Sequence, residues 1–164
     1  MVGPGIVRPF DTLAFTGGVL SVKTFENSDG TSFDAVRLYN PTASALVAGR
    51  PYVVTYDGDE ESNPSAIAPT ATAAFPQWIV IAQEAVAATS WGWFGYRGVM
   101  PVVSILGTTG VKDDHFGVTG SAPTGLTEVG TVRSISTMAV LTETANPAGN
   151  YRAILYGDAP VTIL

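Results

Sequence analysis

The chain has 164 residues, of which 13% are charged, a net charge of −6 at pH 7 and no cysteine. Soluble proteins are typically about 25% charged, so a free monomer would have a surface unusually poor in charge. We therefore expect part of this surface to be buried in an oligomer or a larger assembly. The lack of cysteine excludes disulfides and zinc–thiolate sites, and the scattered basic residues argue against a nucleic-acid partner. Neither a membrane-spanning run nor a signal-peptide pattern is present, so we expect no membrane partner.

An irregular N-terminal arm over residues 1–11 is predicted ahead of a single β domain over residues 12–164. Prolines and glycines recur in the arm and prevent both a helix and a central strand. Ile6, Val7 and Phe10 are apolar and need cover. The stretch is either an arm that docks on a neighbouring molecule or a frayed terminus. In the first case, these three side chains are interface residues.

The rest of the chain has the pattern of an all-β protein. Runs rich in β-branched and aromatic residues alternate with Gly, Pro, Asn and Asp turn signals. The predicted fold is a small β-sandwich or barrel, jelly-roll-like, with the extended N-terminal arm. The expected strands are 13–15, 19–25, 35–39, 52–56, 78–82, 91–97, 99–106, 126–129, 132–141, 151–156 and 161–164. Residues 137–143 and 151–156 are expected to form a hairpin, and no internal repeat is evident.

Two alanine-rich segments are the best helical candidates. Prolines interrupt the first, residues 66–75. The second, residues 79–89, favours a strand followed by a bend, with a short helix as the alternative. Residues 57–65 are acidic and polar and predict an exposed loop.

The acidic loop does not fit the known calcium-loop pattern. Counted from Asp57, that pattern needs Gly at position 6 and Glu at position 12, where the chain has Ser62 and Ala68. A solvated acidic turn is the simpler interpretation.

Other candidates for chemistry are equally weak. His115 is the only histidine and follows two aspartates, a pattern typical of a surface turn rather than of a catalytic triad. Glu84 and Glu143 each precede aromatic residues and could form the carboxylate pair of a glycosidase, but nothing in the sequence ties them together. We therefore expect no enzyme activity, no catalytic residue, no cofactor and no metal site.

The densest aromatic run is residues 91–97. On a strand, Trp91 and Trp93 face one way, whereas Phe94 and Tyr96 face the other. This pattern favours core packing plus a subunit interface, with Trp91 and Trp93 as interface anchors. The alternative is a platform on which sugar rings stack.

Several stretches carry a family resemblance. They are an A-x-E strand at residues 81–85, the aromatic strand ending in glycine at 91–98, a glycine-rich turn at 107–116 and a last strand at 153–157. Together they resemble the β module of the head decoration, or cement, proteins of tailed bacteriophages, over about half of the chain. The turn departs from the family pattern at Asp113, where glycine usually precedes the aspartate.

The resemblance implies a structural virion protein. Such a protein binds the outer surface of an icosahedral capsid and bridges neighbouring capsomers. Its partners would be the major capsid protein and further copies of itself, as a homotrimer, and it would assemble in the host cytoplasm. The alternative function is a tail, neck or fibre module that binds host surface glycans.

Overall fold

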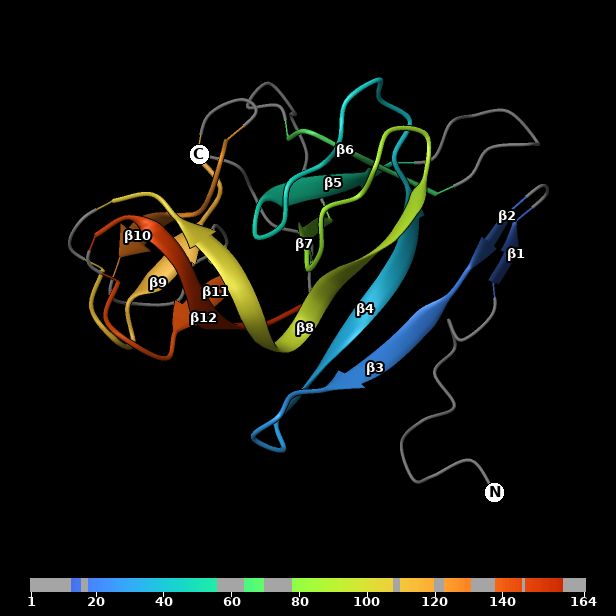
Figure 1. Cartoon of the computed structure of the whole chain (residues 1–164). Helices are drawn as coiled ribbons and strands as arrows, with labels where there is room; N and C mark the ends of the chain where they lie inside the picture. The colour runs from blue at the N-terminus through green and yellow to red at the C-terminus, as the bar shows by residue number, and fades with distance from the viewer. Residues whose placement is uncertain are drawn as a thin grey trace.

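The computed structural model describes residues 13–15, 18–55, 64–69, 78–107, 110–119, 123–130, 138–145 and 147–157 (Figure 1). All regular elements of this part are strands, which confirms the all-β prediction. No helix in the described ranges is long and apolar enough to cross a membrane. The predicted arm, with Ile6, Val7 and Phe10, lies outside the described residues, as do most of the acidic loop and the strand expected at 161–164.

The strands are β1 Leu13–Phe15, β2 Gly18–Leu20, β3 Val22–Glu26, β4 Ser32–Tyr39, β5 Pro51–Thr55, β6 Ser65–Ile67, β7 Ile79–Ala82, β8 Trp91–Ile105, β9 His115–Gly117, β10 Thr127–Gly130, β11 Ala139–Leu141 and β12 Gly149–Leu155. β1 and β2 form a separate hairpin, and the remaining strands form one 10-stranded sheet. The predicted hairpin near the C-terminus is confirmed as the antiparallel pair β11–β12.

The first half of the sheet closes on itself. β8, β7, β5, β6 and β4 are successive neighbours, and β4 pairs again with β8. The closing contact between β4 and β6 is parallel and joins Tyr39 to Ser65. We call these five strands, closed into a small barrel, the first ring. Apolar side chains fill its interior, with Leu38, Val80 and Phe94 fully buried. The barrel alternative of the prediction therefore describes this half.

The second half repeats the arrangement with β8, β12, β11, β9 and β10. A parallel bridge between Ile105 and Leu126 closes this second ring, and the Leu126 amide donates to the Ser104 carbonyl at 2.7 Å. The cluster that contains Phe116 and Leu141 fills it and also includes outward-facing residues of the first ring, such as Ile81. The two rings thus pack against each other as well as sharing β8.

β8 passes from one ring to the other at Gly98. The sequence predicts two strands here, but the structure has one strand, bent at a glycine with φ of +96°. A Cβ at this position would lie 2.5 Å from the Ser32 carbonyl oxygen. Only glycine fits both the left-handed backbone and this close approach.

The two rings share details of their loops, which the sequence does not reveal. In the first ring Leu46 forms an antiparallel bridge with Val86, and in the second Gly110 forms one with Ala145. The side chains at these matched positions differ in size, so the repeated backbone leaves no repeated sequence pattern.

The turns that follow these bridges also match. Gly49 and Asp113 both have positive φ, of +81° and +74°. The Gly49 amide donates to the Ala82 carbonyl at 2.7 Å, and the Asp113 amide donates to the Leu141 carbonyl at 3.0 Å. We therefore treat the rings as two copies of one backbone architecture.

Two short strands differ from the prediction. β6 begins at Ser65, inside the segment expected to be loop and then a helical candidate, because Val53, Val54 and Thr55 of β5 pair with it. β9 begins at His115, where a surface turn was expected, because both β10 and β11 pair with it. Both short strands form because strands distant in the sequence pair with them, and such pairing cannot be predicted from the local sequence.

Candidate functional site

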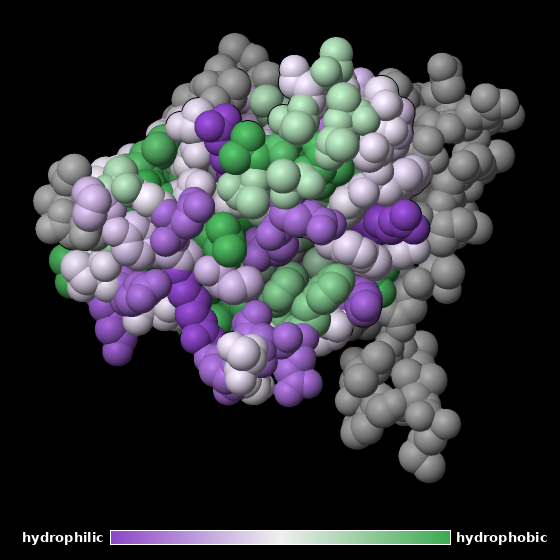
Figure 2. Space-filling view, in the orientation of Figure 1, coloured by the Kyte–Doolittle hydropathy of each residue, from purple (hydrophilic) through white to green (hydrophobic). Residues whose placement is uncertain are grey.

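The most distinctive surface lies on β3, β4 and the first half of β8. Cross-strand pairing sets Tyr39 opposite Trp91 and Arg37 opposite Trp93. We call this surface the aromatic face and define it by Lys23, Phe25, Arg37, Tyr39, Trp91 and Trp93. In Figure 2, apolar side chains lie over the area where β4 and β8 run side by side, next to hydrophilic ones.

Its outer part is built around Trp91. The Tyr39 and Trp91 ring centroids are 5.6 Å apart at an interplanar angle of 55°. The Arg37 guanidinium carbon lies 5.6 Å from the Trp91 ring centroid, a cation–π arrangement. Trp91 is 36% exposed. An indole, a phenol ring and a guanidinium therefore meet at one partly open site.

The inner part is more tightly packed. Phe25 stacks on Phe33 with centroids 5.3 Å apart and meets the edge of Trp93 at 5.4 Å. The Lys23 ammonium lies 4.7 Å from the Phe25 centroid. Trp93 packs against the core cluster that includes Phe33. Of the two predicted anchors, Trp91 is therefore the more available to a partner.

The opposite side of β8 faces the interior of the first ring. Phe94 is fully buried and meets Tyr52 edge-on at 5.8 Å, and Tyr96 meets Trp78 edge-on at 5.7 Å. The predicted alternation of aromatic residues along this strand is confirmed. Trp91 and Trp93 thus belong to the outer side.

The cations of the aromatic face are not neutralised by described acids. Within the described residues, neither Lys23 nor Arg37 forms an ion pair. Nearby Arg97 behaves differently: its guanidinium lies 3.1 Å from the buried carboxylate of Asp34. Lys23 and Arg37 therefore leave the face with cations available to an acidic partner.

The two glutamates considered as a catalytic pair each stabilise a hairpin. The Glu84 carboxylate accepts the Trp93 amide at 3.4 Å, and the Glu143 carboxylate accepts the Arg152 amide at 3.0 Å. Both bonds span nine residues and close equivalent hairpins, one in each ring. The structure does not bring these acids together across a cleft.

The acids beside His115 are not arranged to orient its ring. His115 is half-buried on β9, where its Nδ1 lies 3.4 Å from the Tyr156 hydroxyl. The Asp114 carboxylate instead accepts the Val111 amide at 2.8 Å. The expected surface turn is wrong, because His115 belongs to a strand that pairs on both sides. Among the described residues, no group of three His, Cys, Asp or Glu could hold a metal ion.

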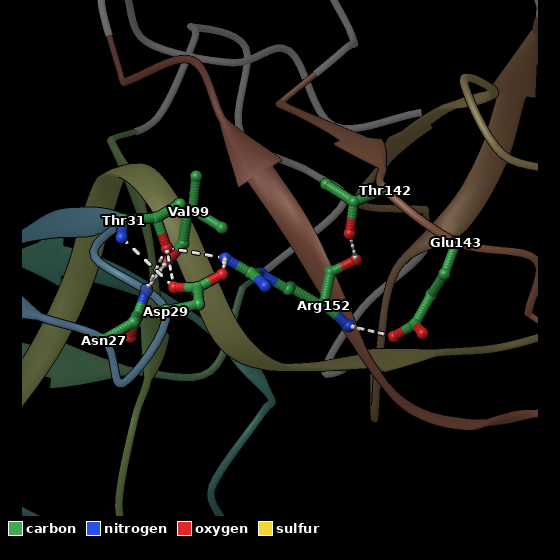
Figure 3. A network of polar contacts seen from close by, with 7 residues as sticks. All are labelled: Asn27, Asp29, Thr31, Val99, Thr142, Glu143 and Arg152. Carbon is green, nitrogen blue, oxygen red and sulfur yellow. Dashed lines mark hydrogen bonds and ion pairs between the residues drawn. The ribbon is translucent and has the colours of Figure 1, made fainter.

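Apart from the aromatic face, a cluster of polar side chains connects the two halves of the molecule (Figure 3). From β12, the Arg152 guanidinium donates to the Thr31 hydroxyl at 2.6 Å and pairs with Asp29 in the β3–β4 turn. Asn27 donates from the same turn to the Val99 carbonyl on β8 at 2.8 Å. Hydrogen bonds from the Thr31 hydroxyl and amide, followed by Arg152, lower the pKa of Asp29 to about 2. This cluster stabilises the junction of the rings.

Comparison of the rings shows that the backbone position of the outer site can be filled without aromatic residues. The cross-strand pair Tyr39–Trp91 of the first ring corresponds to Ser104–Asn150 in the second. Ser104 and Asn150 form a side-chain hydrogen bond of 2.7 Å. In the second ring, a small polar pair therefore occupies the equivalent backbone position.

Sequence reasoning found Trp91 and Trp93 but missed their neighbours Lys23, Arg37 and Tyr39. The two tryptophans stand out because they are spaced two apart on one strand. The others join them only through the register of β3, β4 and β8, which the sequence does not give.

A scan against known protein families finds no matching family, and a search of curated proteins finds no match either.

Proposed function

We propose that this protein is a structural virion protein of the decoration, or cement, kind. It binds the outer surface of an icosahedral phage capsid and bridges neighbouring capsomers, without catalysing a reaction. The observation that carries this proposal is the aromatic face, where Arg37, Tyr39 and Trp91 meet at a partly open site whose counterpart in the second ring is a small polar pair.

The composition of that site supports binding to protein. Trp, Tyr and Arg are the residues most enriched at the energetic centres of protein interfaces, whereas Lys and Glu are depleted there. Charged residues are also sparse along the whole chain. Both features are expected of a molecule that works while covered by other protein.

The described candidates for chemistry support a non-catalytic role. The carboxylates of Glu84 and Glu143 each accept a hydrogen bond from a hairpin amide, and the Asp114 carboxylate accepts one from a turn amide. Their positions are accounted for by local structure. Function would then come from interface area that adds contacts across capsomer boundaries and so stabilises the shell by mass action.

Co-sedimentation with empty expanded capsids tests the proposal directly. We expect the wild-type protein to sediment with the capsids and to raise the temperature at which they disassemble. The matched control is Tyr39→Ser/Trp91→Asn, which places the second ring's polar pair in the first ring and should bind more weakly. Absence of wild-type protein from the capsid pellet would refute the proposal.

The half-exposed indole of Trp91 favours one second candidate. In a tail, neck or fibre module, a sugar ring could stack on Trp91 while Arg37 and Tyr39 donate hydrogen bonds. A glycan array with the isolated protein separates the two functions. Specific glycan binding that disappears in Trp91→Ala, together with no capsid binding, would favour the second candidate over the first.

A further inference from the structure

We propose that the aromatic face is covered by the turn Val111–Asp114 of a second copy of this chain, in a head-to-tail contact. The proposal rests on the protein-binding role proposed for this face and names its partner: the face joins copies of the chain, and the assembled oligomer is what binds the capsid. It begins from two exposed surfaces with complementary chemistry, one on each ring.

The receiving surface is the outer part of the aromatic face. It offers the flat indole of Trp91, 36% exposed, and the guanidinium of Arg37 above it. Arg37 forms no ion pair within the described residues. A partner that fits must therefore present an apolar side chain next to a carboxylate.

The turn before β9 presents that combination. Val111 is 55% exposed, the highest value among the large apolar side chains described. Asp113 follows two residues later and is exposed, and its carboxylate has no hydrogen bond or ion pair with any described residue. By contrast, Asp114 is engaged inside the turn, where its carboxylate accepts the Val111 amide at 2.8 Å. Val111 and Asp113 are thus free to contact Trp91 and Arg37 of another copy.

The positions of the two surfaces favour a contact between copies rather than within one. Figure 1 shows β3 and β4 at one end of the molecule and β9, which the turn precedes, with β10 at the other. A contact between unlike surfaces at opposite ends is heterologous, and such contacts generate a ring when the rotation closes. We therefore expect a closed ring of identical copies, whose number the measured mass gives.

Charge explains why the partner is this chain rather than an unrelated apolar surface. The chain carries a net charge of −6, so two copies repel each other unless acids meet cations. Lys23 and Arg37 concentrate cations on the aromatic face. The turn is attracted to it because Asp113 and Asp114 outnumber Lys112. Complementary charges of this kind set the register of an interface and suppress wrong contacts.

A charge reversal tests the pairing. The mass of the full chain is measured by size-exclusion chromatography with light scattering over a range of protein concentrations. We expect an oligomer for the wild type. Arg37→Asp and Asp113→Lys should each raise the dissociation constant of the oligomer about tenfold or more. The double variant Arg37→Asp/Asp113→Lys should recover the oligomer, because each interface again joins opposite charges.

Two controls keep the result interpretable. Circular dichroism and thermal melting confirm that each variant folds, and Asp113→Asn, which tolerates positive φ, removes the charge without straining the turn. Glu26→Lys changes an exposed charge that lies outside both contacting surfaces and should leave the mass unchanged.

A monomeric wild type at millimolar concentration would overturn the inference, as would single variants with wild-type mass or a double variant that stays dissociated. Capsid sedimentation gives an independent result. Capsid binding by a monomer refutes only this contact, whereas a charge-dependent oligomer without capsid affinity refutes only the proposed function.

Discussion

Trp91 and Asn150 occupy the same position in two copies of one backbone architecture. Trp91 lies opposite Tyr39 in the β4–β8 ladder, and Asn150 lies opposite Ser104 in the β8–β12 ladder. The first pair makes an aromatic contact, and the second makes a hydrogen bond of 2.7 Å. The two rings therefore present the same backbone position once with an aromatic pair and once with a polar pair.

The first prediction exchanges these pairs. Tyr39→Ser/Trp91→Asn should fold, because the second ring folds with the same two side chains. The loss of the aromatic contact should cost about 0.5–1.5 kcal/mol. For a chain of this size, that lowers the melting temperature by roughly 1–6 °C. Partner binding should fall far more than stability does. A collapse of folding in this variant, measured by thermal melting, would show that the aromatic pair is structural.

The second prediction concerns the two glutamates that hold the hairpins. Glu84→Ala and Glu143→Ala should each lower the free energy of unfolding by about 0.5–1.5 kcal/mol. Glu143→Ala should have the larger effect, because its hydrogen bond to the Arg152 amide is 3.0 Å long against 3.4 Å for Glu84. Urea titrations measure both effects. The Gln variants are the controls and should lose less, because an amide oxygen also accepts.

Residue patterns predict the strand content of this fold well. Period-two alternation and turn residues locate β1 at residues 13–15, and they place β5, β7 and β12 to within about two residues. They fail at β6 and β9, which are three residues each and exist because distant strands pair with them. The ring closure and the repeat depend on such long-range pairing and are therefore hidden from local patterns.

The candidate site is predictable only in part, for the same reason. Trp91 and Trp93 share a strand, so their common face follows from sequence. Arg37 and Lys23 lie far away along the chain and reach the tryptophans only through the pairing of β3, β4 and β8. The repeat escapes notice because matched interior positions differ in volume, as Val86 and Ala145 do.

The third prediction is acid sensitivity at the junction of the rings. The pKa of Asp29 is lowered from 3.8 to about 2 in the folded state by Thr31 and Arg152. The folded state therefore binds this proton less tightly than the unfolded state, and Asp29 stabilises the fold fully above about pH 4. That stabilisation is lost as the pH falls from about 4 to about 2.

Comparison with Asp29→Asn isolates this effect. The variant should be less stable than the wild type at pH 7, and the difference should shrink through this acidic range and disappear below about pH 2. Urea midpoints at several pH values measure it. Glu26→Gln removes an exposed carboxylate outside the cluster and controls for net charge. A stability difference between Asp29→Asn and wild type that stayed constant down to pH 2 would contradict the assigned role.

The fourth prediction tests how the first ring is packed at Gly92. A Cβ at this position would lie 2.2 Å from a methyl group of Val86, so Gly92→Ala should destabilise the protein by about 1–3 kcal/mol. The second ring combines Ala145 and Tyr151 at the matched positions, a smaller residue facing a larger one. Adding Val86→Ala should therefore recover part of the loss. Gly149→Ala is the control, because its nearest contact would be an ordinary 3.6 Å. If the double variant were no more stable than Gly92→Ala in thermal and urea unfolding, the proposed exchange of volume between these positions would be wrong.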